Sequence, residues 1–375
     1  MLVEENFCKT TVLLDSGHFQ VDLPLKGPNA NGTLGESFDF ARKRFYQLEK
    51  RFEKNPDLFL QYKKFIDEYI SLNHARIVPL SMKSDQNENK YFFPHHCVIR
   101  NDSKSSKLRV VFDGSLKTSS GLSLNDIMYK GYTVQPDLYD ILLRFRTFKY
   151  VITSDIEKMY RQVRINPKHT YLHNILWREK PCEKLQCIEL STVTYGTNCA
   201  PYLATRVLKE LAVINQKTFP LASNALLSQC YVDDILCGQD SYENLVELHR
   251  QLMQLCKLGN FHLHKWCSNS NSLLNNINHS HKSDISQENY DIKVDGISNK
   301  VLGIFWNPNL DVFSISLPIP SEEKQVTKRE VLSKIAQMFD PLGLIGPVIV
   351  IGKLMMQEIW KTKIDWDDFL EKIFL

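Results

Sequence analysis

Apolar residues recur at two different spacings along the chain, which predicts a mixture of helices and strands. After a start that reads as extended and turn-rich over residues 1–35, two stripes follow with helical spacing. The second helix begins at Asn55-Pro56, where the asparagine side chain suits an N-cap and the proline suits the first turn. The first stripe is Ala41, Phe45, Leu48 and Phe52, and the second is Leu58, Tyr62, Phe65, Ile66 and Tyr69.

From residue 76 onward, runs of strand-forming residues alternate with further helical stripes. Strands are predicted over 76–79, 91–100, 108–113, 149–156, 230–236, 301–306 and 312–317. Helices are predicted over 137–148, from Pro201, from Ser241 to Gly259, from a capping box at Thr327–Glu330 to Pro341, and over 347–363. The Asn-, Ser- and His-rich residues 268–299 are predicted to be a long mobile loop. Hairpins instead of regular strand–helix–strand crossovers indicate an α+β fold.

Composition adds few constraints to this picture. The 375 residues are 43% hydrophobic and 24% charged, which is ordinary for a soluble globular protein with two or three subdomains. The net charge of +3 permits a nucleic-acid partner without requiring one. Nine cysteines form no C-x-x-C pair, and no leader-like segment begins the chain. The apolar stretch 342–354 is too short to span a bilayer, so we expect an intracellular protein with reduced thiols and no membrane contact.

One early motif suggests a different class of protein. Residues 12–17, Val-Leu-Leu-Asp-Ser-Gly, resemble the active-site turn of an aspartic protease, with Asp15 as its acid. Such a protease needs a second aspartate turn or a dimer partner, and a later apolar strand ending in glycine. The residues that follow are helical in pattern instead, so we do not favour this alternative.

The strongest local signal is the adjacent pair Asp233 and Asp234, flanked by apolar residues on both sides in 231–236. Neighbouring side chains of a strand point to opposite faces, so two adjacent acids suit a tight hairpin better than a regular strand. Carboxylates that are close together and partly buried repel each other, and a bound cation compensates for this. The alternative is a solvent-exposed turn, in which aspartate pairs are common.

A second acidic position changes the balance. The apolar strand 149–156 carries Asp155 at its end, followed by Tyr160, Gln162 and Val163. With the Tyr-x-Asp-Asp sequence at 231–234, this pattern resembles the reverse transcriptases of retroelements. The resemblance implies that both segments are neighbouring strands of a palm sheet. It also implies a two-metal site for phosphoryl transfer, with two Mg²⁺ ions for which Mn²⁺ can substitute. Asp155 and Asp233 would then be the main metal ligands and Asp234 would shape or charge the site.

Other motifs of the same family match around these acids. Arg109, four residues before Asp113, corresponds to the fingers arginine that grips the incoming triphosphate, and Arg100 is a second candidate. Both arginines have a plain alternative as solvated charges of a hairpin. Tyr160 would lie under the sugar and exclude a 2′-hydroxyl, with Gln162 beside the substrate.

Three further segments complete the match. Tyr195-Gly196, before Pro201, resembles the turn that opens the palm helix near the templating base pair; an ordinary turn-to-helix junction would look similar. Lys265 corresponds to a lysine that donates a proton to pyrophosphate, although a structural role is open. Leu302-Gly303 resembles the hairpin that supports the primer end, and a core strand is its alternative. His262, His264 and Cys267 form only a weak candidate zinc site, since a fourth ligand at normal spacing is missing.

The lineage that fits best is the BEL/Pao type of long-terminal-repeat retrotransposon. The stretches that carry this resemblance are residues 107–126, 302–307 and 331–350, and the helical region 37–79 is also similar. Members are polyproteins with protease, polymerase, ribonuclease H and integrase parts. The resemblance places this chain between the protease and the ribonuclease H.

The resemblance implies a right-hand polymerase. Residues 1–75 would form an N-terminal extension with two helices and 76–148 the fingers. Residues 149–317 would form the palm, with 164–194 returning to the fingers, and 318–375 a truncated helical thumb or connection. The implied function is RNA- and DNA-directed DNA polymerisation from dNTPs on an RNA or DNA template-primer, alongside other parts of the polyprotein. Retrotransposon particles in the cytoplasm, or the nucleus, would be its location. The alternative is an inactive nucleic-acid-binding remnant; a host scaffold protein has no supporting feature.

Overall fold

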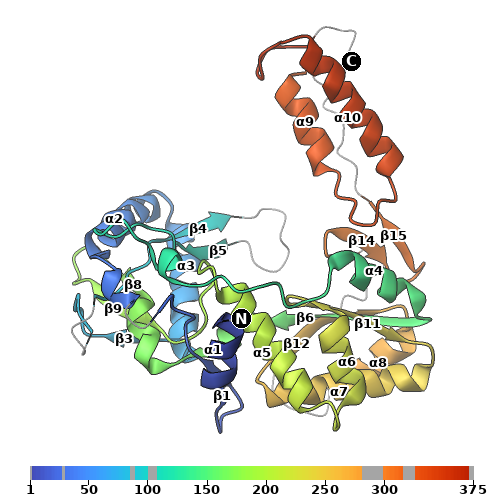
Figure 1. The fold of residues 1–375 in the computed structure, drawn as a ribbon, viewed down its shortest axis with the longest axis horizontal. Helices are drawn as coiled ribbons and strands as arrows, with labels where there is room; N and C mark the ends of the chain where they lie inside the picture. Colours follow the sequence, from blue (N-terminus) through green and yellow to red (C-terminus); the bar gives the residue numbers. More distant parts are fainter. Residues whose placement is uncertain are drawn as a thin grey trace. The chain divides into compact units, whose positions relative to one another are not determined.

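The structure is a computed structural model that describes residues 2–27, 30–84, 89–99, 108–280, 299–315 and 326–370. Its mixture of helices and strands confirms the α+β class (Figure 1). The chain divides into two compact units. Unit 1 comprises residues 1–135, 156–227 and 251–262, and unit 2 comprises residues 136–155, 228–250 and 263–375. The division cuts through the predicted palm, because residues 195–227 belong to unit 1.

Unit 1 contains the two helices predicted near the N-terminus and three small sheets. Both helices bury the predicted apolar stripes, and Asn55 Oδ1 accepts a hydrogen bond from the Leu58 amide at 3.1 Å, as an N-cap should. The sheets have strand orders β1-β2-β7, β3-β9-β8 and β4-β5. The helices are α1 (Leu2–Thr10), α2 (Phe38–Lys54), α3 (Pro56–Ser71), α5 (Ala200–Ile214) and α6 (Pro220–Ser228). The strands are β1 (Val12–Leu13), β2 (Phe19–Val21), β3 (Ala75–Val78), β4 (His95–Ile99), β5 (Leu108–Phe112), β7 (Arg164–Ile165), β8 (Asn174–Trp177) and β9 (Gln186–Leu190).

The first helix corrects the prediction that residues 1–35 are extended and that the N-terminal extension has only two helices. α1 buries Phe7, and the Arg206 guanidinium lies 4.5 Å from the centre of the Phe7 ring. Glu4 accepts a hydrogen bond from Arg206 Nε at 2.9 Å. The partner that stabilises α1 is thus far away in the sequence, and a local pattern does not contain it. Asp15, the protease candidate, lies in the turn between β1 and β2.

Unit 2 is built on a four-stranded sheet with the order β10-β11-β6-β12. Its strands are β10 (Cys230–Tyr231), β11 (Asp234–Gln239), β6 (Tyr150–Glu157) and β12 (His262–Ser268). α4 (Leu138–Thr147) and the small sheet of β13 (Asn299–Val301), β14 (Ile304–Asn307) and β15 (Val312–Ser314) cover one face. The first half of α7 (Tyr242–Leu258) and α8 (Asn271–Ser280) lie along the other face (Figure 1).

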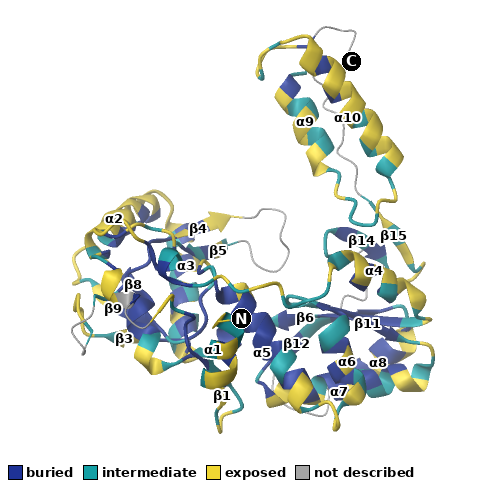
Figure 2. Cartoon of the chain, viewed as in Figure 1, coloured by how far each residue is buried: buried dark blue, intermediate teal, exposed yellow. Residues whose placement is uncertain are grey.

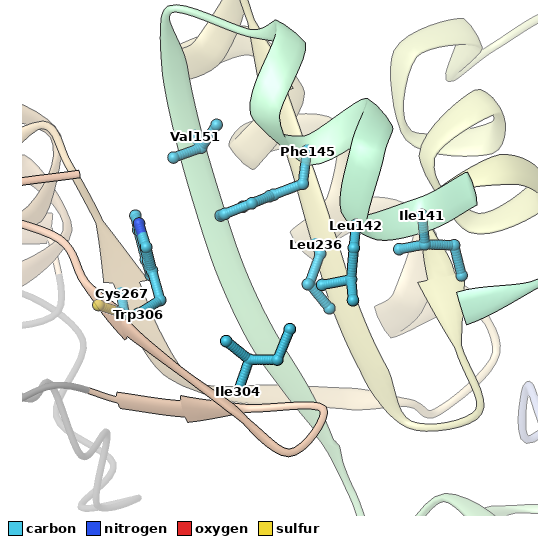
Figure 3. Packing of buried hydrophobic residues seen from close by; sticks show 8 residues of the cluster. All are labelled: Ile141, Leu142, Phe145, Val151, Leu236, Cys267, Ile304 and Trp306. Carbon is cyan, nitrogen blue, oxygen red and sulfur yellow. The ribbon is translucent and has the colours of Figure 1, made fainter. Parts of the chain in front are cut away.

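The core on the α4 side fixes the register of the central strands. Phe145 of α4, Val151 of β6, Leu236 of β11 and Trp306 of β14 are fully buried against one another (Figure 3). Side chains two residues apart on a strand share a face, so this packing also decides which face Asp155 occupies. The aspartate belongs to the same face as Val151, at the end of the strand.

Two predictions in unit 2 were wrong. Residues 271–280 of the predicted mobile loop form α8, because three apolar side chains at helical spacing (Leu273, Leu274 and Ile277) are buried beneath the polar residues. The rest of that loop, 281–298, lies outside the described residues. The predicted strand 301–306 is two strands, β13 and β14, joined by a tight turn at Leu302-Gly303 with φ values of +49° and +91°.

The last two helices form a hairpin with a small core of their own. α9 (Lys328–Gln337) begins with the predicted capping box, in which Glu330 Oε2 accepts from the Thr327 amide at 2.8 Å. α10 (Gly346–Lys361) packs on it through Met356 and Ile359, while most of its other apolar side chains are exposed (Figure 2). In the part of the chain that the structure describes, no helix has the length and apolar character needed to cross a membrane.

Candidate active site

The central strands of unit 2 bring together the three acids that the sequence singled out. β6 and β11 are antiparallel neighbours in which Asp155 lies directly opposite Asp234. Cross-strand partners have Cβ atoms about 5 Å apart, and two like charges at such positions destabilise a sheet. Asp233 lies beside them, in the two-residue turn between β10 and β11. Three carboxylates, from β6, β11 and the β10–β11 turn, thus lie close together at one end of these paired strands.

The turn that holds Asp233 is strained. Its other residue, Val232, has φ +56°, a conformation that branched side chains rarely adopt. Such an outlier costs about 1–3 kcal/mol and persists only where the surrounding structure imposes it. Here the pairings of Tyr231 with Asp234 and of Cys230 with Ile235 impose the tight connection. Strain of this kind is concentrated at functional turns, which supports a role for this hairpin.

Two basic side chains of β12 contact Asp155 from the other side. His264 Nε2 donates to Asp155 Oδ1 at 2.7 Å, and Lys265 Nζ donates to Oδ2 at 3.1 Å. All three side chains are only partly exposed, between 23% and 30%. Burial alone would raise the pKa of Asp155, but the hydrogen bond from His264 and the charge of Lys265 hold that pKa below its ordinary value. Asp155 is therefore ionised at neutral pH.

Asp234 behaves in the opposite way. Burial and then the charges of Asp233 and Asp155 raise the pKa of Asp234 to about 7, although Lys265 lowers it. The raised value reports that the three carboxylates are close enough to repel one another. Ionisation of all three acids is unfavourable because their negative charges repel one another. A bound cation would reduce this repulsion, so cation binding is favoured here.

The predicted substrate-binding residues lie in unit 1, whereas the predicted primer support Leu302-Gly303 lies in unit 2, in the turn between β13 and β14. Arg109 is exposed on β5, in the predicted hairpin with β4, whereas Arg100 lies outside the described residues. Tyr160 and Gln162 belong to a short 3-10 helix, Met159–Gln162, in which Gln162 is buried. That helix follows directly on β6, so Tyr160 is five residues along the chain from Asp155.

Tyr195 and Gly196 pack against β5, the strand that carries Arg109. The Tyr195 ring centre is 5.3 Å from that of Phe112, and burial raises the pKa of Tyr195 to about 12. Gly196 has φ +100°, and its carbonyl accepts a hydrogen bond from Asn125 Nδ2 at 3.2 Å. The turn before Pro201 lies close to the backbone of β5, whereas its predicted approach to a templating base pair stays a prediction.

Comparison with known proteins bears on the C-terminal part of the chain. Residues 327–374 match the family model described as "Pao retrotransposon-like RNaseH-like domain". This region is of retroelement polyprotein type. The match confirms the predicted relationship to Pao-type retroelements. It includes α9 and α10, which we predicted to be thumb or connection helices.

One solved structure is similar to part of the chain. The crystal structure of Prototype Foamy Virus Protease-Reverse Transcriptase matches with 19% identity and a TM-score of 0.42. The alignment covers 56% of this chain and 24% of the viral chain, so it spans about a quarter of that protein. No curated protein sequence matches.

The three carboxylates are chemically suitable ligands for a divalent cation. Their present arrangement, however, is not that of a formed metal site. Carboxylate oxygens are what Mg²⁺ and Mn²⁺ prefer, and the mutual repulsion at Asp234 gives the site an electrostatic reason to bind one. Among the described residues, however, no three His, Cys, Asp or Glu side chains are positioned together to hold a metal ion. Both oxygens of Asp155 are engaged by His264 and Lys265, which is consistent with that result.

The same observations disfavour the zinc alternative. The Nε2 atom of His264 contacts Asp155, and the Cys267 side chain is buried in the core cluster of unit 2. His264 itself is a site residue whose role the sequence analysis missed. The sequence analysis named His264 only as a weak zinc candidate. Its position next to Lys265 did not indicate a shared partner, because a regular strand directs two consecutive side chains to opposite faces.

Gly196 offers a test of how closely this turn approaches β5. A Cβ atom at Gly196 would lie 2.0 Å from the carbonyl oxygen of Phe112, so Gly196→Ala forces the two segments apart. At Gly121, φ is +79° but the space is open, so Gly121→Ala costs only the backbone strain, about 1 kcal/mol. We expect Gly196→Ala to lower the free energy of unfolding by roughly 1–3 kcal/mol more than that. Urea denaturation of both variants measures the difference, and equal losses would contradict the close approach.

Proposed function

We propose that this chain is the polymerase part of a retrotransposon reverse transcriptase, which extends a primer 3′-hydroxyl with dNTPs on an RNA or DNA template. The observation that carries the proposal is the register of β6 and β11, which sets Asp155 opposite Asp234 with Asp233 in the adjoining turn. Under this proposal, unit 2 supplies the catalytic part of a palm. Unit 1 supplies fingers residues, and α9 and α10 a helical thumb or the start of a ribonuclease H-like part.

Each residue then has a role in the transfer. Asp155 and Asp233 hold two divalent cations, which when bound supply the positive charge that phosphoryl transfer requires. Asp234 keeps the local charge negative enough to attract them. Lys265, whose Nζ donates to Asp155 Oδ2 at 3.1 Å, gives a proton to the departing pyrophosphate. Arg109 binds the triphosphate through its planar guanidinium, and Leu302-Gly303 supports the primer end.

A primer-extension assay on the purified full chain tests the proposal. The chain is incubated with a labelled primer on RNA and on DNA templates, with all four dNTPs and Mg²⁺ or Mn²⁺. A parallel gel-shift assay measures binding of the template-primer. We expect extension on both templates. Binding without extension under either metal would contradict the proposal and favour the nucleic-acid-binding remnant.

Tyr160 provides a prediction about substrate choice. If its ring lies under the sugar of the incoming nucleotide, Tyr160→Ala opens space for a 2′-hydroxyl. We expect the preference for dNTPs over rNTPs, measured as the ratio of kcat/KM values, to fall by about tenfold or more, because steric discrimination of a small group amounts to about 1–3 kcal/mol. Tyr160→Phe keeps the ring and serves as the matched control. An unchanged ratio in Tyr160→Ala would remove Tyr160 from the sugar site.

A further inference from the structure

The two oxygens of Asp155 have different basic partners, and both partners come from one irregular point of β12. Oδ1 accepts from His264 Nε2 at 2.7 Å and Oδ2 from Lys265 Nζ at 3.1 Å. Consecutive side chains of a regular strand point to opposite faces, so they do not reach one carboxylate. Lys265 has φ +55°, which breaks the alternation in the manner of a β-bulge. This local conformation lets both side chains meet Asp155.

The irregular point is held in place by the neighbouring strand. Ser154 Oγ, on β6 next to Asp155, donates to the carbonyl oxygen of His264 at 2.9 Å. A left-handed lysine in a strand is unfavourable and persists only where surrounding contacts enforce it. Bulges next to reactive groups re-aim side chains. The positions of the His264 and Lys265 side chains are therefore determined by the backbone of the sheet.

The two partners differ in what they offer the carboxylate. The Lys265 ammonium places a full positive charge at Oδ2 of Asp155. A divalent cation bound to Oδ2 would be repelled by this charge, so the ammonium and the cation compete for that oxygen. The imidazole of His264 donates one directed hydrogen bond to the ionised carboxylate and fixes its orientation. Partners of this second kind strengthen metal binding by holding the ligand in place.

We propose that His264 and Lys265 act in opposite directions on cation binding at Asp155. Lys265 occupies Oδ2 and has to withdraw before that oxygen can bind a divalent cation. His264 retains Oδ1 and keeps the carboxylate directed for binding. Lys265 thus regulates entry to the site, and His264 is a positioning residue. The inference rests on the proposed function, because it takes the three acids as the cation site.

Direct titration with Mn²⁺ tests this inference without reference to catalysis. The full chain is titrated at fixed pH and ionic strength, without nucleotide or nucleic acid, and the free Mn²⁺ is followed by electron paramagnetic resonance. The variants are Lys265→Met, His264→Ala and His264→Gln, in which the glutamine amide can replace the imidazole donor. Lys257→Met, at an exposed lysine of α7, is the control for the loss of a positive charge. Circular dichroism establishes that each variant is folded.

We expect Lys265→Met to bind Mn²⁺ about tenfold more tightly than the unmodified chain, since a neighbouring positive charge has been removed. His264→Ala should bind about tenfold more weakly, as is typical when a residue that orients a metal ligand is lost. His264→Gln and Lys257→Met should stay close to the unmodified chain. Equal affinities in Lys265→Met and the unmodified chain, or unchanged binding in His264→Ala, would overturn the inference.

The titration also separates this inference from the proposed function. If the unmodified chain binds Mn²⁺ no better than Asp233→Asn, the acids are not a cation site, and both proposals fail. If Asp233→Asn abolishes binding while the His264 and Lys265 variants do not diverge, only the inference fails.

Discussion

Replacement of Asp233 by Asn is expected to reduce primer extension by at least about 10³-fold while leaving the fold intact. The substitution keeps the size of the side chain and removes one of the charges that, under the proposed function, would hold the divalent cations. Such cations stabilise the transferred phosphoryl group by several kcal/mol. Asp233 lies in the turn between β10 and β11, where an amide is readily accommodated. Steady-state extension rates and urea denaturation measure the two effects.

Asp15→Asn is the matched control for this experiment. Asp15 is exposed in the β1–β2 turn of unit 1, and its sequence resembles the active-site turn of a protease. Its substitution should leave extension unchanged. Extension at near-normal rates by purified Asp233→Asn, or an equal loss in Asp15→Asn, would contradict the assignment of the catalytic acids.

The second large effect is a change in the free energy of unfolding with pH, caused by Asp234. The pKa of Asp234 is raised to about 7 in the folded chain by burial and by the charges of Asp233 and Asp155, whereas an unfolded aspartate titrates near 4. Between these values the folded state holds a proton that the unfolded state has released. The free energy of unfolding therefore falls as the pH rises from about 4 to 7. The loss is complete above pH 7 and amounts to at most about 4 kcal/mol, since one pKa unit corresponds to about 1.4 kcal/mol.

Asp234→Asn should remove this contribution because the amide has no charge to bury. In buffer with EDTA, we expect the variant to be more stable than the unmodified chain at pH 8 and nearly equal to it at pH 4.5. Urea denaturation across this range gives both curves, with Asp240→Asn, at an exposed position after β11, as the control. If the free energy of unfolding changed with pH in the same way for Asp234→Asn and the unmodified chain, burial and the neighbouring charges would not raise the pKa of Asp234.

The sequence predicted those parts of the structure whose stabilising partners are close along the chain. The helix after Asn55 carries its own N-cap, and α9 carries its capping box. The strand that carries Asp155 and the strand that begins at Asp234 both contain runs of apolar residues. Their pairing, with the three acids together, also follows the family resemblance.

The features that were missed depend on contacts between distant residues. α1 is stabilised by Arg206, and α8 by burial of a few apolar side chains among polar ones. The left-handed conformation of Lys265 is enforced by the neighbouring strand, so periodicity alone presents β12 as regular. For this reason the sequence indicated Lys265 as a catalytic candidate and gave no sign that His264 reaches the same carboxylate.

A crystal structure of the chain with Mn²⁺, recorded with anomalous scattering, tests the central claim most directly. We predict an anomalous peak within about 2.0–2.3 Å of carboxylate oxygens from both Asp155 and the 233–234 pair, with Lys265 displaced from Oδ2. A peak bound by only one of these two strand ends, or the absence of any peak at the three acids, would contradict the assignment of this site to metal-dependent nucleotide transfer.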